Sequence, residues 1–337
     1  MKNSIIVLIA LIVVIPAATS RGEDSELHYA DSIKARFDAD PALDSVIAAY
    51  TGYLKADSIA SYIEQLTAFK TRFMLADNRR DIARFIGDKL ASFGFEQVHI
   101  DSFQNTVAFP IKGDELHTTW QYNVAARMPG STHPDDICIL GAHYDCMILG
   151  PGTDPYMFCP GANNNASGVA VCLEIARIFK QMHFVPSGSI EFVAFGSEEF
   201  MTMFISGGSG AQDYVGRLKE SGRNATLMID NNQVSFTPDT VEWKLDFQNY
   251  PGAERVIELA HYICEHYTKI IPVDTNDHIL YTDSRYFHEA GIPAIFFEEY
   301  YFNPYTFTAD DIPANCNIAY CTEVARISCG MLVFLNR

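Results

Sequence analysis

The strongest constraint on the fold is an alternation of apolar, strand-like runs with helical segments that begins near Ile137. The run Ile137–Ala142 is followed by a turn and then by Ala166–Met182, whose apolar residues recur at helical spacing. The same order then repeats, with strands expected at Ile190–Phe195, Ala225–Ile229 and Ala294–Glu298 and helices at Glu254–Tyr267 and Thr322–Leu335. Alternating strands and helices are typical of a largely parallel sheet with helices on both faces, so we expect an α/β fold.

The chain before this region is more helical. Ser45–Tyr53, Ser58–Phe69 and Asp77–Phe93 have helical periodicity, and the strands expected next are Gln97–Phe103 and Tyr122–Met128. No internal repeat or low-complexity linker divides the chain. We therefore expect a helical extension over residues 21–76 that packs on one α/β domain, residues 77–337.

The first twenty residues have the features of a secretory signal peptide. Lys2 precedes an apolar run, Ile5–Ile15, and the small residues Ala18 and Ser20 occupy the positions that a signal peptidase requires. The run has eleven residues, whereas a bilayer-spanning helix needs about 20. An uncleaved anchor is the alternative, and we expect no membrane segment later in the chain. Cleavage near Ser20 predicts an exported protein, periplasmic or extracellular.

Charge and composition narrow the possible partners. The chain of 337 residues carries 24 basic and 42 acidic residues, a formal charge of −18. Loss of the signal peptide removes only Lys2 and leaves a charge near −19. Such a surface repels nucleic acid and anionic lipid but is compatible with a site for cations or amines.

Eight cysteines are present and none forms a CxxC pair, which excludes a zinc ribbon or a thioredoxin motif. In an oxidising compartment disulfides are allowed. A bond between Cys146 and Cys159 is expected, and Cys316 with Cys321 is a second candidate pair.

Chemically active residues follow three expected strands at their carboxyl ends, where ligands bind in open α/β sheets. They are His143, Asp145, Glu198, Glu199 and Asp230. Imidazole and carboxylate groups that converge in this way form a zinc ligand set with one spare carboxylate for proton transfer. In the His-x-Asp pattern the histidine binds the metal, and the aspartate orients the imidazole ring without binding the metal itself.

Three motifs in this order resemble those of exported co-catalytic zinc aminopeptidases, a family whose fold glutaminyl cyclases share. They are Gly141-Ala-His-Tyr-Asp145, Pro160-Gly-Ala-Asn-Asn-Asn-Ala-Ser-Gly168 and Phe195-Gly-Ser-Glu-Glu199, followed downstream by Gly291-Ile-Pro-Ala-Ile-Phe296. The resemblance covers roughly Asp77 to the C-terminus. It implies three layers, with a twisted, mostly parallel eight-stranded sheet flanked by helices, and removal of N-terminal residues from peptides.

The resemblance assigns roles residue by residue. His143 and Asp230 match ligands of the first metal. Glu199 matches a ligand of the second metal, and Glu198 matches the general base. The bridging aspartate of the family is replaced by Asn164, which we expect to be a weak ligand.

The last histidine of the family is also missing. Ser284 stands in its place in Thr282-Asp283-Ser284, and the later segment that supplies it in some relatives reads Tyr305-Thr-Phe307-Thr. We expect Ser284 not to bind metal. A neutral amide offsets the repulsion between two dications less than a carboxylate does. We therefore expect one zinc ion rather than two. A protein that binds no zinc is a further alternative. His278 in a polar loop, His288 and Cys146 are the other residues weighed as replacement ligands.

Three hypotheses remain open. The first is an exported exopeptidase that acts on peptide N-termini with one zinc ion and Glu198 as the base. The second is a catalytically inactive relative that binds peptide or protein through its acidic cleft. The third is a fold without any ligand. A glutaminyl cyclase is disfavoured, because the single-zinc site implied for that enzyme uses the bridging aspartate and the last histidine. The sequence does not indicate an oligomeric state.

Overall fold

The structure, a computed structural model, describes residues 32–108, 116–199, 204–238 and 240–337. The expected signal peptide, residues 1–20, lies outside the described residues.

A single mixed sheet runs through the molecule, and its order is β5-β1-β2-β4-β3-β6-β9-β7-β8. Its four central strands, β4, β3, β6 and β9, are parallel, whereas the pairings β1–β2, β2–β4, β1–β5 and β7–β9 are antiparallel. The strands are β1 Gln97–Ala108, β2 Leu116–Met128, β3 His133–His143, β4 Gly188–Phe195, β5 Phe204–Ser206, β6 Asn224–Asn231, β7 Lys244–Asn249, β8 Ile271–Thr275 and β9 Ala294–Glu299. The α/β class is confirmed, and the nine described strands include the three-residue β5 at one edge.

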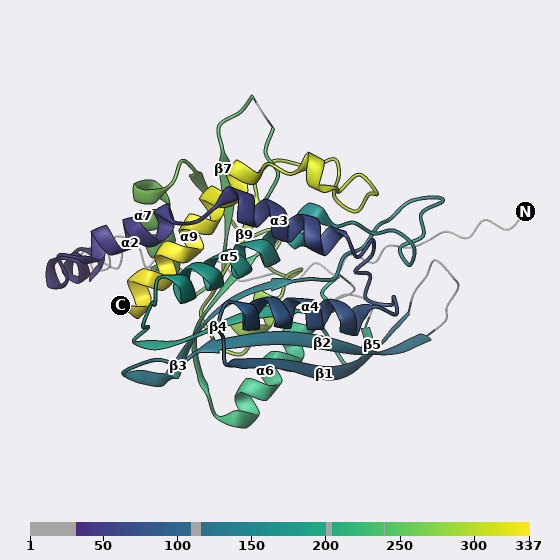
Figure 1. Cartoon of the computed structure of the whole chain (residues 1–337), viewed down its shortest axis with the longest axis horizontal. Helices are drawn as coiled ribbons and strands as arrows, with labels where there is room; N and C mark the ends of the chain where they lie inside the picture. The colour runs from purple at the N-terminus through teal and green to yellow at the C-terminus, as the bar shows by residue number, and fades with distance from the viewer. Residues whose placement is uncertain (1–31, 109–115, 200–203, 239) are drawn as a thin grey trace, which may run out of the picture.

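Helices cover both faces of this sheet and complete the three layers (Figure 1). One face carries most of them: α2 Leu43–Gly52, α3 Ala56–Thr67, α4 Arg79–Ser92, α5 Gly168–Gln181, α7 Glu254–Tyr267 and α9 Ile318–Asn336. The other face carries α6 Gly210–Ser221 and α8 Ser284–Glu289. Each face has its own apolar core, since successive strand residues point to opposite sides.

The first helices belong to the larger of these two cores. Leu43 and Ile47 of α2 and Ile59 and Ile63 of α3 are fully buried in the same cluster as α5 and α9. The backbone N–H of Lys55, between α2 and α3, also donates to the carboxylate of Glu174 on α5 at 2.8 Å.

The closing helix α9 is longer than the expected Thr322–Leu335. It is long and apolar enough to cross a membrane by length and composition, which the sequence analysis did not anticipate, but 78% of that stretch is buried inside the protein. Its contacts with α2, α5 and α7 are those of a core helix.

The expected disulfides are not formed in the structure, where all eight cysteines are free thiols. Cys146 and Cys159 do lie together in a small buried cluster, but the Cys146 thiol donates to the carbonyl oxygen of Cys159 at 2.9 Å. The Cys316 thiol likewise contacts a carbonyl, that of Ile312, at 3.8 Å.

Candidate metal centre and active site

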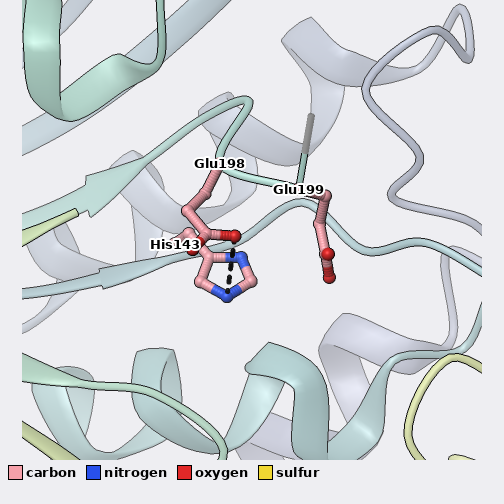
Figure 2. Close-up of side chains that lie close together, drawn as sticks. All are labelled: His143, Glu198 and Glu199. Carbon is pink, nitrogen blue, oxygen red and sulfur yellow. Dashed lines mark ion pairs between the residues drawn. The ribbon is translucent and has the colours of Figure 1, made fainter. Parts of the chain in front are cut away.

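The parallel strands bring three of the expected side chains together at their carboxyl ends. His143 is the last residue of β3, and Glu198 and Glu199 follow the neighbouring strand β4. One ligand atom from each of the three lies within 4.8 Å of the others, and Figure 2 shows both carboxylates beside the imidazole ring. Within the described residues this is the group of metal-binding type that the fold assembles.

His143 is held from both sides of its ring. Its Nε2 lies 3.7 Å from Oε2 of Glu198 and 3.1 Å from Oδ1 of Asn232, and its Nδ1 lies 3.1 Å from the carbonyl oxygen of Asp145. Burial opposes protonation of the ring, but the negative charges of Glu198 and Asp145 outweigh it and raise the pKa of His143 well above its ordinary value.

Asp145 acts mainly on the backbone of the glutamate pair. Its two carboxylate oxygens accept the N–H groups of Glu198 at 2.9 Å and Glu199 at 3.1 Å. The contact from Oδ1 to Nδ1 of His143 is longer, 3.5 Å. Beside this contact with the ring, which the sequence analysis expected, the side chain of Asp145 fixes the turn that carries both glutamates.

A second aspartate fixes the loop that carries Asn164. The carboxylate of Asp311 accepts the N–H groups of Asn163 at 2.7 Å and Asn164 at 2.9 Å. The amide nitrogen of Asn164 then donates to Oε1 of Glu199 at 2.7 Å, and its Oδ1 is buried without a partner among the described residues. Asn164 therefore does meet Glu199, but through a direct hydrogen bond.

The loop approaches β6 closely where α5 begins. Gly168 permits this approach, because a Cβ there would lie 2.1 Å from the carbonyl oxygen of Asn231. Asn165 completes the junction by donating to that same oxygen at 2.9 Å and by accepting the N–H of Gly168 at 2.9 Å.

Asp230 and Ser284, both matched to ligand positions, lie outside the three-residue cluster in the described structure. Oδ2 of Asp230 accepts the hydroxyl of Thr282 at 2.6 Å and the N–H of Ser284 at 3.0 Å. The hydroxyl of Ser284 lies 3.1 Å from that of Tyr250. The loop before α8 thus binds one oxygen of Asp230, whereas the other, Oδ1, is buried without a partner among the described residues.

Burial raises the pKa of several carboxylates in this region. Burial, opposed by the charge of His143, raises the pKa of Glu198 to about 7. Burial and the charge of Glu198 raise the pKa of Glu199 well above its usual range. Asp283, which the sequence analysis did not single out, is buried with both carboxylate oxygens unpartnered among the described residues, and burial raises its pKa strongly. An added cation would relieve this crowding of acidic groups.

Glu198 and Glu199 open into a cavity of about 310 Å³. Its lining comes from five parts of the chain: Asn164, Glu198, Glu199, Asn232, Gln233, His278, Tyr281, Phe296, Glu298 and Phe307. His278 lies on this wall with its Nδ1 2.6 Å from Oε2 of Glu298. The hydrogen bond that the ring donates to Glu298 raises the pKa of His278 to about 9.

The donor set can be compared with what zinc requires. One imidazole and two carboxylates that lie close together are a donor set that suits zinc. At the position matched to the bridging carboxylate Asn164 offers an amide, and the hydroxyl of Ser284 lies 3.1 Å from that of Tyr250.

The chain is similar in sequence to curated peptidases. It is 32% identical over 194 residues to a probable zinc metalloprotease of Pyrenophora teres f. teres, covering 54% of this chain and 39% of that protein. It is 24% identical over 288 residues to a probable aminopeptidase of Saccharomyces cerevisiae, covering 83% of this chain and 72% of that one. The chain thus spans about two fifths of the length of the first relative.

Solved structures share the fold. The LapA aminopeptidase of Legionella pneumophila superposes with a TM-score of 0.70 at 17% identity, covering 86% of this chain and 74% of that one. The glutaminyl cyclase of Porphyromonas gingivalis superposes with a TM-score of 0.67 at 19% identity, covering 83% and 98%. At the level of the family, residues 123–332 match Peptidase family M28. That segment contains the three motifs and the whole His143–Glu198–Glu199 cluster, and the chain belongs to Peptidase family M28.

Proposed function

We propose that the protein is an exported exopeptidase of the aminopeptidase type that removes N-terminal residues from peptides with one zinc ion. The observation that carries this proposal is the cluster of His143, Glu198 and Glu199 at the edge of a cavity. Membership of a peptidase family and relatives named as zinc metalloprotease and aminopeptidase support it. The predicted signal peptide supports export.

His143 and Glu199 would hold the ion, with Asn164 as a further oxygen donor. A bound zinc ion supplies a Lewis acid that polarises a carbonyl group and lowers the pKa of water. Glu198 is placed to accept the proton of the attacking water and to pass it to the leaving amine. A carboxyl group with a pKa of about 7 suits that work, because a general base functions best when its pKa is near the operating pH.

The cavity favours a substrate with a free amine. Glu198, Glu199 and Glu298 place three carboxylates on its wall, and Tyr281, Phe296 and Phe307 add apolar surface. A peptide N-terminus carries an ammonium group next to a side chain of variable polarity, and both parts find complementary surface here.

A non-catalytic peptide-binding protein is the second candidate. It is favoured by the hydrogen bond from Asn164 to Glu199 at 2.7 Å and by the contact of His143 with Asn232 at 3.1 Å. These amides give two of the candidate ligands polar partners without a metal ion. The acidic cavity would then bind the amine of a peptide directly.

Metal content and turnover separate the two candidates. The mature protein is equilibrated with trace zinc and analysed for metal, and hydrolysis of a panel of aminoacyl p-nitroanilides is measured. The proposal requires about one zinc ion per chain, lost in His143→Ala, and turnover that falls by at least about 10²-fold in Glu198→Gln. Glu220→Gln, an exposed position on α6, is the matched control. A chain that binds no zinc and shows no turnover, yet binds a peptide amine, supports the second candidate instead.

A further inference from the structure

One carboxylate on the cavity wall has no role in the proposed hydrolysis. Glu198 and Glu199 are assigned to proton transfer and to zinc, whereas Glu298 belongs to β9 and lines the cavity from another part of the chain. Its side chain is 13% exposed. This inference rests on the proposed function and concerns the class of peptide that the cavity accepts.

A second carboxylate lies directly opposite Glu298 in the sheet. Strands β7 and β9 are antiparallel, and Asp246 is the partner of Glu298 in their register, so both side chains point to the same face. Phe296, two residues before Glu298, shares that face and also lines the cavity. Asp246 is 9% exposed, and its Oδ1 is buried without a partner among the described residues. A buried oxygen of this kind is costly unless a donor or a cation approaches it.

The loop between β8 and α8 adds a third carboxylate and one imidazole. Gln248 anchors this loop, because its Nε2 lies 3.3 Å from Oδ1 of Asp277 and its Oε1 accepts the N–H of His278 at 3.3 Å. Burial and the negative charges of Glu298 and Asp277 raise the pKa of Asp246 to about 7, and the charge of His278 opposes them. We call Asp246, Asp277 and Glu298 the acidic patch. Its three carboxylates face one imidazole, so negative charge is in excess.

Glu298 can accept a further donor from the cavity. Its Oε2 is bound by His278, whereas the donor to its Oε1 among the described residues is Nε2 of Gln233, at a distance of 3.4 Å. A carboxylate oxygen can accept two hydrogen bonds. Lys244 lies on the same strand as Asp246, but its Nζ stands over the ring of Tyr300, 5.2 Å from the ring centre. The acidic patch therefore has room for a cation that enters with the substrate.

The rest of the cavity wall suits the stem of a long basic side chain. Tyr281, Phe296 and Phe307 supply apolar surface in the same cavity as Glu298. Lysine and arginine bury their aliphatic stems against apolar surface while their charged heads bind a polar partner. An aliphatic side chain would use the aromatic surface alone and would leave the acidic patch without a cation.

We propose that the cavity selects peptides whose first residue is lysine or arginine, and that Glu298 is the specificity-determining residue. Oε1 of Glu298 binds the ammonium or guanidinium head. Asp246 adds negative charge beside it, and His278 holds the carboxylate of Glu298 in place. The scissile bond stays at the metal centre.

The test compares two substrates that differ in the ammonium group. The kcat/KM values for L-lysyl- and L-norleucyl-p-nitroanilide are measured on the zinc-loaded mature chain, and the readout is their ratio. The wild-type ratio should be at least about tenfold in favour of lysine, and Glu298→Gln should reduce it below about threefold. Asp246→Asn should lower the ratio in part, because it removes charge but leaves the contact between Glu298 and His278.

Asp274→Asn is the matched control. Asp274 on β8 is also paired with a histidine, since its Oδ1 lies 2.8 Å from Nε2 of His261, but it does not line the cavity. The change in net charge is the same as in Glu298→Gln, and the ratio should stay at the wild-type value. Circular dichroism of each variant verifies that the fold is retained.

Binding of L-lysinamide and L-norleucinamide, measured by calorimetry, gives the same comparison without turnover. Turnover with equal kcat/KM for both substrates would refute the selectivity and leave the proposed function intact. A lysine preference that persists in Glu298→Gln would show that Glu298 does not determine it. A chain without turnover that binds lysinamide more tightly, and loses this preference in Glu298→Gln, would refute the proposed hydrolase and support the acidic patch. Neither turnover nor a preference in binding would refute both.

Discussion

The contact between Gly168 and β6 gives a sharp test of how the fold positions the site. In Gly168→Ala the new Cβ would lie 2.1 Å from the carbonyl oxygen of Asn231, whereas real Cβ contacts essentially never fall below 3.0 Å. The start of α5 must therefore move by about 0.9 Å or more relative to a carbonyl group of the central sheet. Overpacking of this kind costs about 1–3 kcal/mol.

The movement also strains the hydrogen bonds that join the two elements. Asn165 links the N–H of Gly168 to the carbonyl of Asn231 through contacts of 2.9 Å each. Weakening one of them adds about 1 kcal/mol, so we expect Gly168→Ala to destabilise the protein by about 3 kcal/mol in total.

Gly216→Ala is the control with the same chemical change and the opposite expected sign. Gly216 lies on the exposed side of α6, and a Cβ there has no atom within 4 Å. Alanine in a helix interior is favoured over glycine by about 1 kcal/mol. Urea unfolding at one pH measures both variants. Equal stability of Gly168→Ala and the wild-type chain, with Gly216→Ala behaving as expected, would refute the reasoning.

Three further predictions concern the site and its support. Asp145→Asn leaves one of the N–H groups of Glu198 and Glu199 without an acceptor and should cost about 1–3 kcal/mol in urea unfolding, an effect that an unchanged midpoint would contradict. Burial and the charge of Glu298 raise the pKa of Asp246 to about 7. Protonated Asp246 therefore contributes stability that is fully present below its unfolded pKa and is lost as the pH rises through about 7. Asp246→Asn should flatten the decline in the free energy of unfolding measured between about pH 5 and pH 8. Ile47→Ala should cost about 2–4 kcal/mol if residues 21–76 fold as part of the domain, and a loss below about 0.5 kcal/mol in thermal or urea unfolding would instead mean a separable extension.

The sequence predicted the long, strongly patterned elements well. Helix α7 has the expected bounds, and β3, β4, β6 and β9 lie where their apolar runs placed them. Those strands are buried on both faces, so their composition alone identifies them. Other helices and strands were not predicted, because their sequence patterns are weak. Strand β7 alternates polar and apolar residues over only six positions, β8 contains Pro272, and α6 is interrupted by Gly216.

The candidate site, like the fold, could be predicted only in part. The convergence of His143, Glu198 and Glu199 followed from the rule that parallel strands end at one edge, and the cluster confirms that these three side chains meet. The partners that hold them depend on loop conformation, which the sequence pattern does not encode. Ser197 adopts a left-handed φ of 69° just before Glu198, in the turn whose backbone Asp145 binds. Asn232 reaches His143 across 89 residues of sequence.

Asn164 offers a last test of why one ion is expected and not two. Its amide nitrogen donates to Oε1 of Glu199 at 2.7 Å. The zinc aminopeptidases that the sequence resembles have a bridging carboxylate at this position. Asn164→Asp restores that carboxylate in the sequence but not the missing imidazole. Without zinc it replaces a hydrogen bond by a contact between two buried carboxylates, and we expect a loss of about 2 kcal/mol or more in urea unfolding. Added zinc should recover part of this loss while the metal content stays near one ion per chain. Two ions in Asn164→Asp would contradict the argument, because a carboxylate at this position would then be sufficient for a second ion without the last histidine.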